Sequence, residues 1–279
     1  MNYKVGTRGS KLALVQTNLV IDQLKKTFPE DNFEPVIIKT LGDKRLEAPI
    51  DQLGGRGVFV DEIEAALLED RIQMAVHSMK DMPVELRQGL IMAEPPKRED
   101  PRDVLICREA DSLTSLREGA IIATCSKRRA FQLRKLRPDL EFVDIRGNID
   151  TRLRKLSEPM ADGRYMDGIV LAAAGLHRLG RQDEITQYFT IEEMIPSPCQ
   201  GILAVELRES DRGLYEKLSA VSDAATIKAA EAERSFLKSV GGSCHLPIGA
   251  YLDTDNNILH TLFGNEDGSL MDIKREKYE

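Results

Sequence analysis

The chain has 279 residues, of which 42% are hydrophobic and 30% charged, and it carries a formal net charge of −7. This length exceeds one ordinary hydrophobic core and suffices for two or three domains. The composition is typical of a soluble globular protein and no apolar run could span a bilayer. The N-terminus lacks the pattern of a signal peptide, so we expect a cytoplasmic location.

Predicted strands and helices alternate through the first ninety residues, which indicates α/β layers and a largely parallel sheet. In chain order the expected elements are a strand over 3–7, a helix from its N-cap Ser10 to about Lys26, a buried strand over 35–40, a glycine-rich loop over 53–57, a helix over 60–70 and a strand over 73–78.

Two proline-rich stretches interrupt this alternation, at 94–103 (EPPKREDPRD) and 195–202 (IPSPCQGI). We expect the chain to cross between two lobes at these stretches. The expected elements after the first crossing are strands over 120–124, 141–145, 167–173 and 203–207 and helices that begin at Ser126 and Asn148.

The last segment has a different pattern. Residues 223–240 indicate a helix, and 241–252 and 257–264 indicate a turn and antiparallel strands, so we expect a small α+β domain. Cys244 follows the helix in GGSCHLPIG, where the glycines and Pro247 place it on a loop.

The chain has four cysteines, and none of the spacings between them is the C-x-x-C of zinc or redox motifs. No metal site is expected. A small buried apolar residue is the simplest interpretation of a single cysteine. It suits Cys107, at the end of the apolar run DVLIC, better than the glycine-flanked Cys244.

Small, polar or charged residues occupy the expected carboxyl ends of the strands, where open α/β sheets bind ligands. Basic residues at a helix N-terminus oppose the helix dipole, so a bound carboxylate or phosphate is expected to compensate them. The alternative is a solvated basic helix face. The arginines concerned are Arg8, Arg128, Arg129, Arg146 and Arg152.

The window 121–156 contains ten Lys or Arg and four acidic residues, a net charge of +6, so the rest of the chain carries −13. A basic region in an acidic chain favours a specific anionic ligand over bulk adhesion to nucleic acid.

Asp81, next to Lys80 at the end of an apolar strand, is the acidic complement of these arginines. A carboxylate among arginines can stabilise positive charge or accept N–H bonds while it stays ionised. On position alone, however, the sequence favours a helix N-cap or turn aspartate. His77 is interpreted as a structural residue at the strand end, and His245 beside Cys244 leaves a Cys–His nucleophile open.

Taken together, the motifs resemble the porphobilinogen deaminase family, also called hydroxymethylbilane synthase. The resemblance runs from Val5 to about Tyr251. Its motifs, in order, are GTRGSKLALVQT, GGRGVFVDEIEAALL, MAVHSMKDMP, KREDPRDVLI, the pair Arg128-Arg129, IRGNIDTRL, LAAAGLHRLG, PCQGILAVEL and GGSCHLPIG.

This resemblance implies a transferase of tetrapyrrole (haem) biosynthesis that joins four porphobilinogen molecules head to tail, releases ammonia each time and frees hydroxymethylbilane. It also implies a dipyrromethane cofactor, built from the same substrate and held by a thioether to Cys244, whose loop would hold the growing chain over a cleft between the lobes. Each pyrrole ring carries an acetate and a propionate, which would account for the arginines.

The resemblance further implies roles for individual residues. Asp81 would be catalytic, because it hydrogen-bonds pyrrole N–H groups and stabilises the cationic azafulvene left when ammonia departs. The residues implied to bind the cofactor are Cys244, Lys80, Asp81, Thr124, Ser126, Arg128, Arg129, Gly147 and Asp43, the last in a loop that covers the cleft. Those implied to bind the substrate or growing chain are Arg8, Ser10, Arg146, Arg152 and Arg178.

The implied fold consists of two periplasmic-binding-protein-like α/β lobes and a small α+β C-terminal domain. We expect residues 1–95 with 197–215 in the first lobe, 100–194 in the second and 219–279 in the small domain. A monomer without nucleic-acid or membrane partners is expected.

Two other classes of protein fit parts of the sequence. A two-lobed anion-binding module, such as a solute receptor or an effector-binding domain, shares the α/β layout but has no need of Cys244. A nucleic-acid binder that used 121–155 would be expected to display aromatic side chains. The chain contains no Trp and only 5% aromatic residues.

Overall fold

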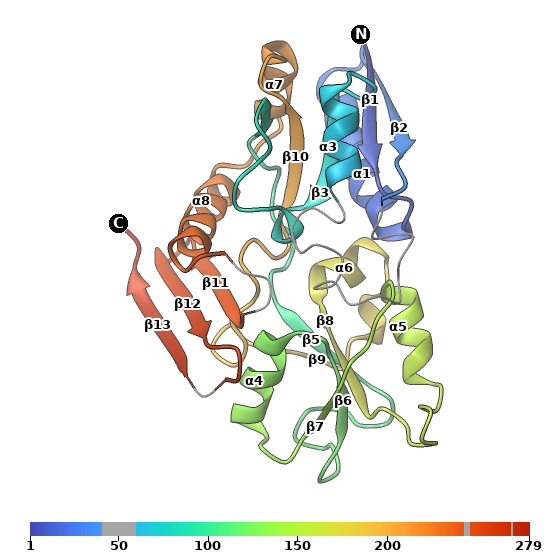
Figure 1. Ribbon diagram of the computed structural model, residues 1–279, viewed down its shortest axis with the longest axis vertical. Helices are drawn as coiled ribbons and strands as arrows, with labels where there is room; N and C mark the ends of the chain where they lie inside the picture. Colours follow the sequence, from blue (N-terminus) through green and yellow to red (C-terminus); the bar gives the residue numbers. More distant parts are fainter. Residues whose placement is uncertain (41–59, 243–245, 269) are drawn as a thin grey trace. The chain divides into compact units, whose positions relative to one another are not determined.

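The computed structural model describes residues 1–40, 60–242, 246–268 and 270–279 (Figure 1). The chain forms two compact units, Met1–Glu99 with Ile202–Ala230 and Asp100–Gly201 with Glu231–Glu279. It passes between them within the two proline-rich stretches and again within the last helix. The three-stranded C-terminal sheet belongs to the second unit, and the division into three domains stays a prediction.

The first unit is a five-stranded sheet of order β2-β1-β3-β10-β4 with helices on both faces. Its elements are β1 (Asn2–Thr7), α1 (Lys11–Thr27), β2 (Asn32–Ile37), α3 (Asp61–Leu68), β3 (Met74–Ser78), the 3-10 turn η2 (Met79–Asp81), β4 (Leu90–Met92), β10 (Leu203–Arg208) and α7 (Arg212–Ser219).

The side chains of β3 point alternately to the two faces of the sheet, and a separate hydrophobic cluster lies on each face. Met74 and Val76 pack with Leu24 of α1, whereas Ala75 packs with Ile63 and Leu67 of α3. The predicted N-cap of α1 is confirmed, because the Ser10 side chain accepts a hydrogen bond from the Ala13 N–H at 3.2 Å.

The prediction of a buried strand over 35–40 is wrong. The strand is β2, three residues earlier, and in the described sheet it pairs with β1 alone. Pro35 lies within it, which an edge strand tolerates because the missing N–H donor faces no partner strand. Most of its residues are exposed, and Ile37 is 54% exposed.

The second unit contains a five-stranded sheet of order β7-β6-β8-β5-β9 and a three-stranded antiparallel sheet of order β11-β12-β13. Its elements are β5 (Asp103–Cys107), β6 (Ile121–Ala123), α4 (Lys127–Leu136), β7 (Glu141–Val143), α5 (Ile149–Leu156), β8 (Gly168–Ala172), α6 (Ala173–Arg178), the 3-10 turn η3 (Gln182–Glu184), β9 (Gln187–Tyr188), β11 (Ile248–Asp253), β12 (Ile258–Gly264) and β13 (Met271–Lys277), and α8 (Ala224–Ser239) enters it from the first unit.

Helices also cover both faces of the second five-stranded sheet. Ile122 and Val170 pack with Leu133 of α4, whereas Ile121 and neighbouring residues of β5 and β8 pack with α5 and α6. The predicted α/β class, with a small sheet at the C-terminal end of the chain, is confirmed (Figure 1).

The prediction of a largely parallel sheet holds for only part of each sheet. β1, β2 and β3 are parallel, as are β6, β7 and β8, but β10 and β5 are antiparallel to their neighbours. These two strands follow the chain crossings. Their amino ends therefore lie at the same edge as the carboxyl ends of the parallel strands: Leu203 pairs with Ser78, and Asp103 with Ala172.

Across the described part of the chain, we find no helix of the length and apolarity needed to cross a membrane. Within the same residues no group of three or more His, Cys, Asp or Glu side chains is arranged to hold a metal ion.

Candidate functional site

In the first unit, four predicted site residues lie at one edge of the sheet. Arg8 and Ser10 follow β1, while Lys80 and Asp81 follow β3, and these two strands are parallel neighbours. The fold therefore brings these side chains to a common edge, as the strand-end argument predicts.

Asp81 ends a short turn that is fixed at both sides. The Met79 N–H donates to the Ile202 carbonyl at 2.9 Å, and the Ser78 hydroxyl accepts from the Gln16 amide at 3.0 Å. The Asp81 side chain itself is exposed, and its carboxylate makes no hydrogen bond or ion pair with the described residues. The turn that carries Asp81 is thus fixed, while the carboxylate has no partner among the described residues.

His77 has the structural position that the sequence indicates. Its side chain is 6% exposed, and its Nε2 lies 3.3 Å from Oε2 of the fully buried Glu206 on β10. It faces the core of the unit and not the edge that carries Asp81.

In the second unit, a set of short polar side chains follows β6. The Ser126 side chain caps α4 by accepting from the Arg129 N–H, as predicted, and the Thr124 hydroxyl accepts from the Ser126 N–H at 3.1 Å. Cys125 between them is exposed, with its thiol 2.9 Å from the Ile145 carbonyl. Backbone and hydroxyl groups thus converge at the N-terminus of a helix, the usual setting for an anion.

Arg128 and Arg129 do not form a solvated helix face. Their side chains are only 5% and 8% exposed, and both bind the fully buried carboxylate of Asp103. The compensating anion expected from the sequence is therefore present, at least in part, inside the protein itself. Sequence reasoning missed Asp103; the available signal was an acidic residue directly before the apolar run of β5.

The loop after β7 brings Arg146, Gly147 and Arg152 together. Gly147 has a φ of +116°, and a Cβ there would lie 2.7 Å from Cγ2 of Thr151, so glycine is required. The Arg152 Nε donates to the Gly147 carbonyl at 2.8 Å. Asn148 caps α5 by accepting from the Thr151 N–H, which fixes where the loop becomes a helix.

Arg178, at the end of α6, is half-buried and donates to the Gly201 carbonyl at 2.6 Å. This contact joins α6 to the second proline-rich stretch within the same unit. Two predicted cofactor residues, Asp43 and Cys244, lie outside the described residues, as does His245.

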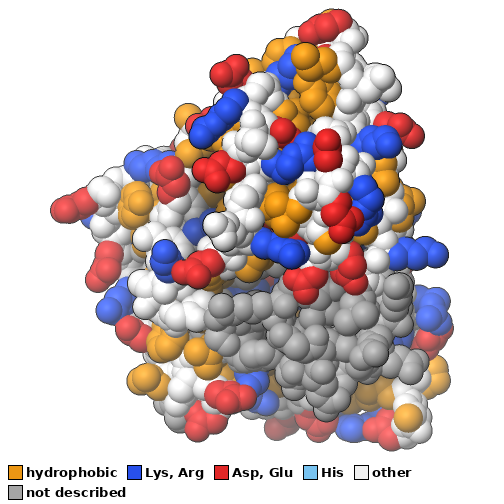
Figure 2. Space-filling view, turned by 45° about the horizontal axis from the view of Figure 1, so that its top comes forward, with side chains coloured by type: hydrophobic (Ala, Val, Ile, Leu, Met, Phe, Trp, Pro, Cys, Tyr) orange, Lys and Arg blue, Asp and Glu red, His pale blue; other side chains and the backbone are white. Residues whose placement is uncertain are grey.

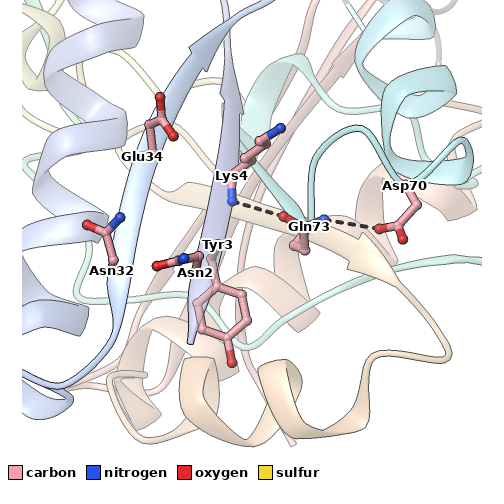
Figure 3. Close-up of a pocket in the computed structure, with 7 residues that line it drawn as sticks. All are labelled: Asn2, Tyr3, Lys4, Asn32, Glu34, Asp70 and Gln73. Carbon is pink, nitrogen blue, oxygen red and sulfur yellow. Dashed lines mark hydrogen bonds between the residues drawn. The ribbon is translucent and has the colours of Figure 1, made fainter.

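A polar hollow of about 360 Å³ lies at the other end of the first sheet (Figure 3). The start of β1, together with Gln73 and Asp70, lines it, and Gln73 joins the Lys4 N–H to Asp70 by hydrogen bonds. Because Arg8 and Ser10 follow the opposite end of the same strand, this hollow is separate from the candidate site.

The surface charges do not favour the nucleic-acid alternative. On the face drawn in Figure 2, the described Lys and Arg side chains alternate with Asp and Glu and form no continuous basic surface. Within 121–156, Arg137 is paired with Asp139, and Arg134 lies 4.8 Å from the centre of the Phe142 ring.

Comparison with known families decides between the candidate classes. Residues 3–216 match the model of the porphobilinogen deaminase dipyrromethane cofactor-binding domain, and residues 227–278 match that of the porphobilinogen deaminase C-terminal domain. The chain belongs to the porphobilinogen deaminase family. The predicted family and its enzymatic class are confirmed, and neither alternative class is supported.

Two curated porphobilinogen deaminases illustrate how completely the chain matches the family. The enzyme of Lachnospira eligens is 54% identical over 272 residues, which cover 96% of this chain and 91% of that protein. The enzyme of Clostridioides difficile is 49% identical over 277 residues, which cover 98% of this chain and 90% of that protein. The family's dipyrromethane cofactor and its polymerisation of porphobilinogen are therefore the cofactor and reaction of this chain.

Solved structures show a weaker likeness. The methionine-binding protein MetQ has a TM-score of 0.49 and 14% identity, over 84% of this chain and 95% of that one. A periplasmic substrate-binding protein from Coxiella burnetii has a TM-score of 0.44 and 15% identity, over 84% and 97%. The family assignment rests on the sequence matches and not on these likenesses.

Proposed function

We propose that this chain converts four porphobilinogen molecules to hydroxymethylbilane with the edge residues described above, and that Cys244 carries the dipyrromethane cofactor through a thioether. The observation that carries the proposal is the set of basic, hydroxyl and carboxylate side chains gathered at one edge of each five-stranded sheet. The ligand involved carries an acetate and a propionate on each ring, which matches arginine and hydroxyl donors.

In the first unit, Asp81 is the proposed catalytic residue. Its exposed carboxylate, which has no partner among the described residues, can accept pyrrole N–H bonds and stabilise the positive charge that develops on the substrate as ammonia leaves. A group that interacts more strongly with this charged state than with the neutral ground state lowers the barrier. Lys80 is proposed to bind cofactor carboxylates, and Arg8 and Ser10 those of the substrate or growing chain.

In the second unit, the residues around the start of α4 fit the cofactor. Thr124, Ser126 and Gly147 offer hydroxyl and backbone groups, and the buried pair Arg128 and Arg129 supplies positive charge that carboxylates can neutralise. Arg146, Arg152 and Arg178 are proposed to bind the substrate or growing chain. When bound, the dipyrromethane supplies the primer on which the chain grows.

Three further features belong to the proposal. A cytoplasmic location is part of the proposal. The family resemblance supports a monomer that binds neither nucleic acid nor membranes. Asp43, which lies outside the described residues, is proposed to bind the cofactor.

Intact mass under denaturing conditions tests the proposed attachment. The purified protein should exceed its sequence mass by two deaminated porphobilinogen units, because a thioether survives denaturation. Cys244→Ala should lack this increment. The control is Cys125→Ser, which changes an exposed thiol after β6 in the second unit, and it should keep the increment. An active protein of unmodified mass, or an increment that persists in Cys244→Ala, contradicts the proposal.

A further inference from the structure

The buried charges around Asp103 form a cluster that the roles above do not explain. Three charged side chains meet there: Asp103 is fully buried, and Arg128 and Arg129 are 5% and 8% exposed. Burying charged groups is costly unless they are paired and hydrogen-bonded, so such a cluster points to a specific purpose.

Asp103 is almost saturated with donors. Its Oδ2 accepts from Nη1 of Arg128 at 2.7 Å, and its Oδ1 accepts from Nε and Nη2 of Arg129 at 3.0 and 2.7 Å. The Gln200 amide donates to the same Oδ1 at 3.0 Å. A single carboxylate therefore fixes two neighbouring guanidinium groups from one turn of helix.

Backbone carbonyls complete the fixation of the two arginines. Nη1 of Arg128 also donates to the Ile195 carbonyl at 2.7 Å, and Nη1 of Arg129 donates to the Val170 carbonyl at 3.0 Å. The Nε and Nη2 of Arg128 make no hydrogen bond with the described residues, so part of its planar donor fork remains available.

The charges in this cluster do not cancel. Two guanidinium groups face one carboxylate, and the ion pairs of Arg128 and Arg129 with the described residues include no second acid. Burial alone would raise the pKa of Asp103, but Arg128 and Arg129 outweigh burial and hold that pKa well below its usual range. Asp103 thus stays ionised, and among the described residues the cluster keeps one more guanidinium than carboxylate.

The antiparallel course of β5 explains why Asp103 is in this position. Asp103 is the first residue of β5 and pairs with Ala172 at the carboxyl end of β8. Had β5 run parallel to β8, Asp103 would lie at the opposite edge, away from the start of α4. Gln200, from the second proline-rich stretch, also donates to the Pro101 carbonyl at 2.8 Å and so joins both crossing segments to the cluster.

We propose that Asp103 is a positioning residue of the cofactor site. Its carboxylate holds Arg128 and Arg129 side by side in fixed orientations and neutralises only one of their two charges. The remaining charge is met by one carboxylate of the dipyrromethane. This inference rests on the proposed function, because it takes the arginine pair to be part of the cofactor site.

Cofactor assembly in the apoprotein measures this role directly. Parent and variants are produced in cells that make no porphobilinogen, and each folded apoprotein is titrated with porphobilinogen while intact mass reports the loaded fraction. Asp103→Asn keeps the shape of the side chain but removes its charge. It should need about tenfold more porphobilinogen for half-loading, or more, as expected for the loss of one charge-assisted hydrogen bond.

Two further variants separate positioning from folding. Asp103→Glu keeps the charge, and with it the ion pairing that folding requires, but displaces the carboxylate by one methylene; it should also raise the half-loading concentration. Asp139→Asn is the control, because Asp139 pairs with Arg137 at the other end of α4 at 2.7 Å. It should load like the parent.

The KM of the loaded fractions is a second measurement, because a nonspecific disturbance of the fold would change it. It should stay within about twofold of the parent in all three variants, because the proposed defect lies in holding the cofactor and not in binding substrate. Parent-like loading of a folded Asp103→Asn or Asp103→Glu variant overturns the inference while the proposed function stands. A parent that gains no mass overturns both.

Discussion

Replacement of Asp81 is the most direct test of the proposed chemistry, because the structure predicts little effect on stability and a large effect on turnover. The carboxylate is exposed and makes no hydrogen bond or ion pair with the described residues. Its removal therefore breaks no contact of the described protein. We expect Asp81→Asn to change the free energy of unfolding by no more than about 0.5 kcal/mol, as for other surface substitutions.

The expected effect on turnover is far larger. Asn keeps the shape and some hydrogen bonding of the side chain but removes the charge that stabilises the developing cation. Loss of one preorganised electrostatic contact in an active site costs about 2.7–4 kcal/mol, or roughly 100- to 1000-fold in turnover. Asp81→Glu keeps the charge and displaces it, so it should retain more activity than Asp81→Asn.

Single-turnover kinetics on cofactor-loaded protein provide the measurement, with loading checked beforehand by intact mass. Urea unfolding of the same samples supplies the stability comparison. Near-parent turnover in a loaded Asp81→Asn variant would refute the reasoning and direct attention to Asp43. A large loss of stability would show that the carboxylate has a structural partner after all.

Two predictions concern stability. Gly147→Ala should lose about 1–3 kcal/mol in urea unfolding, because of its φ of +116° and the approach of the new Cβ to Thr151. Gly163→Ala, where φ is also positive but no atom lies within 4 Å, should lose less, and equal losses would contradict the steric argument. Burial, followed by repulsion from Glu206, raises the pKa of Glu64 above its usual 4.5. A carboxyl whose pKa is higher in the folded state costs no stability below its unfolded pKa; the cost grows between the two pKa values and is complete above the folded pKa. Glu64→Gln should therefore be more stable than the parent at pH 7 and lose this advantage as the pH falls through 4.5, as measured by urea unfolding from pH 4 to 8; a pH-independent difference would contradict it.

Local chemistry made the helix starts predictable. A serine or asparagine directly before an apolar-periodic segment has one favoured role, and Ser10, Ser126 and Asn148 all cap the expected helices. The edges on which the candidate residues gather were also predictable, because they depend on the carboxyl ends of parallel strands. The first conclusion uses interactions that span only a few residues, and the second uses the alternation of strands and helices along the sequence.

Strand direction and exposure were less predictable, because they depend on distant parts of the chain. The apolar segment that includes Val36 and Ile37 has the composition of a central strand, yet β2 lies at the sheet edge, where its outer side has no partner strand in the described structure. Similarly, no local pattern shows that β5 and β10 run antiparallel. Their direction follows from the crossings that precede them.

The position of Asp103 changes how the arginines at helix starts are interpreted as evidence for a ligand. Basic residues at helix starts suggest a missing anion, but this argument assumes that the protein does not supply one. At α4 it does, because an antiparallel strand delivers Asp103 to the edge where the helix begins. At α5 the first turn contains Asp150, although that residue also pairs with Arg181. The evidence for a ligand is thus the one positive charge that Asp103 leaves unmatched among the described residues, rather than the number of arginines.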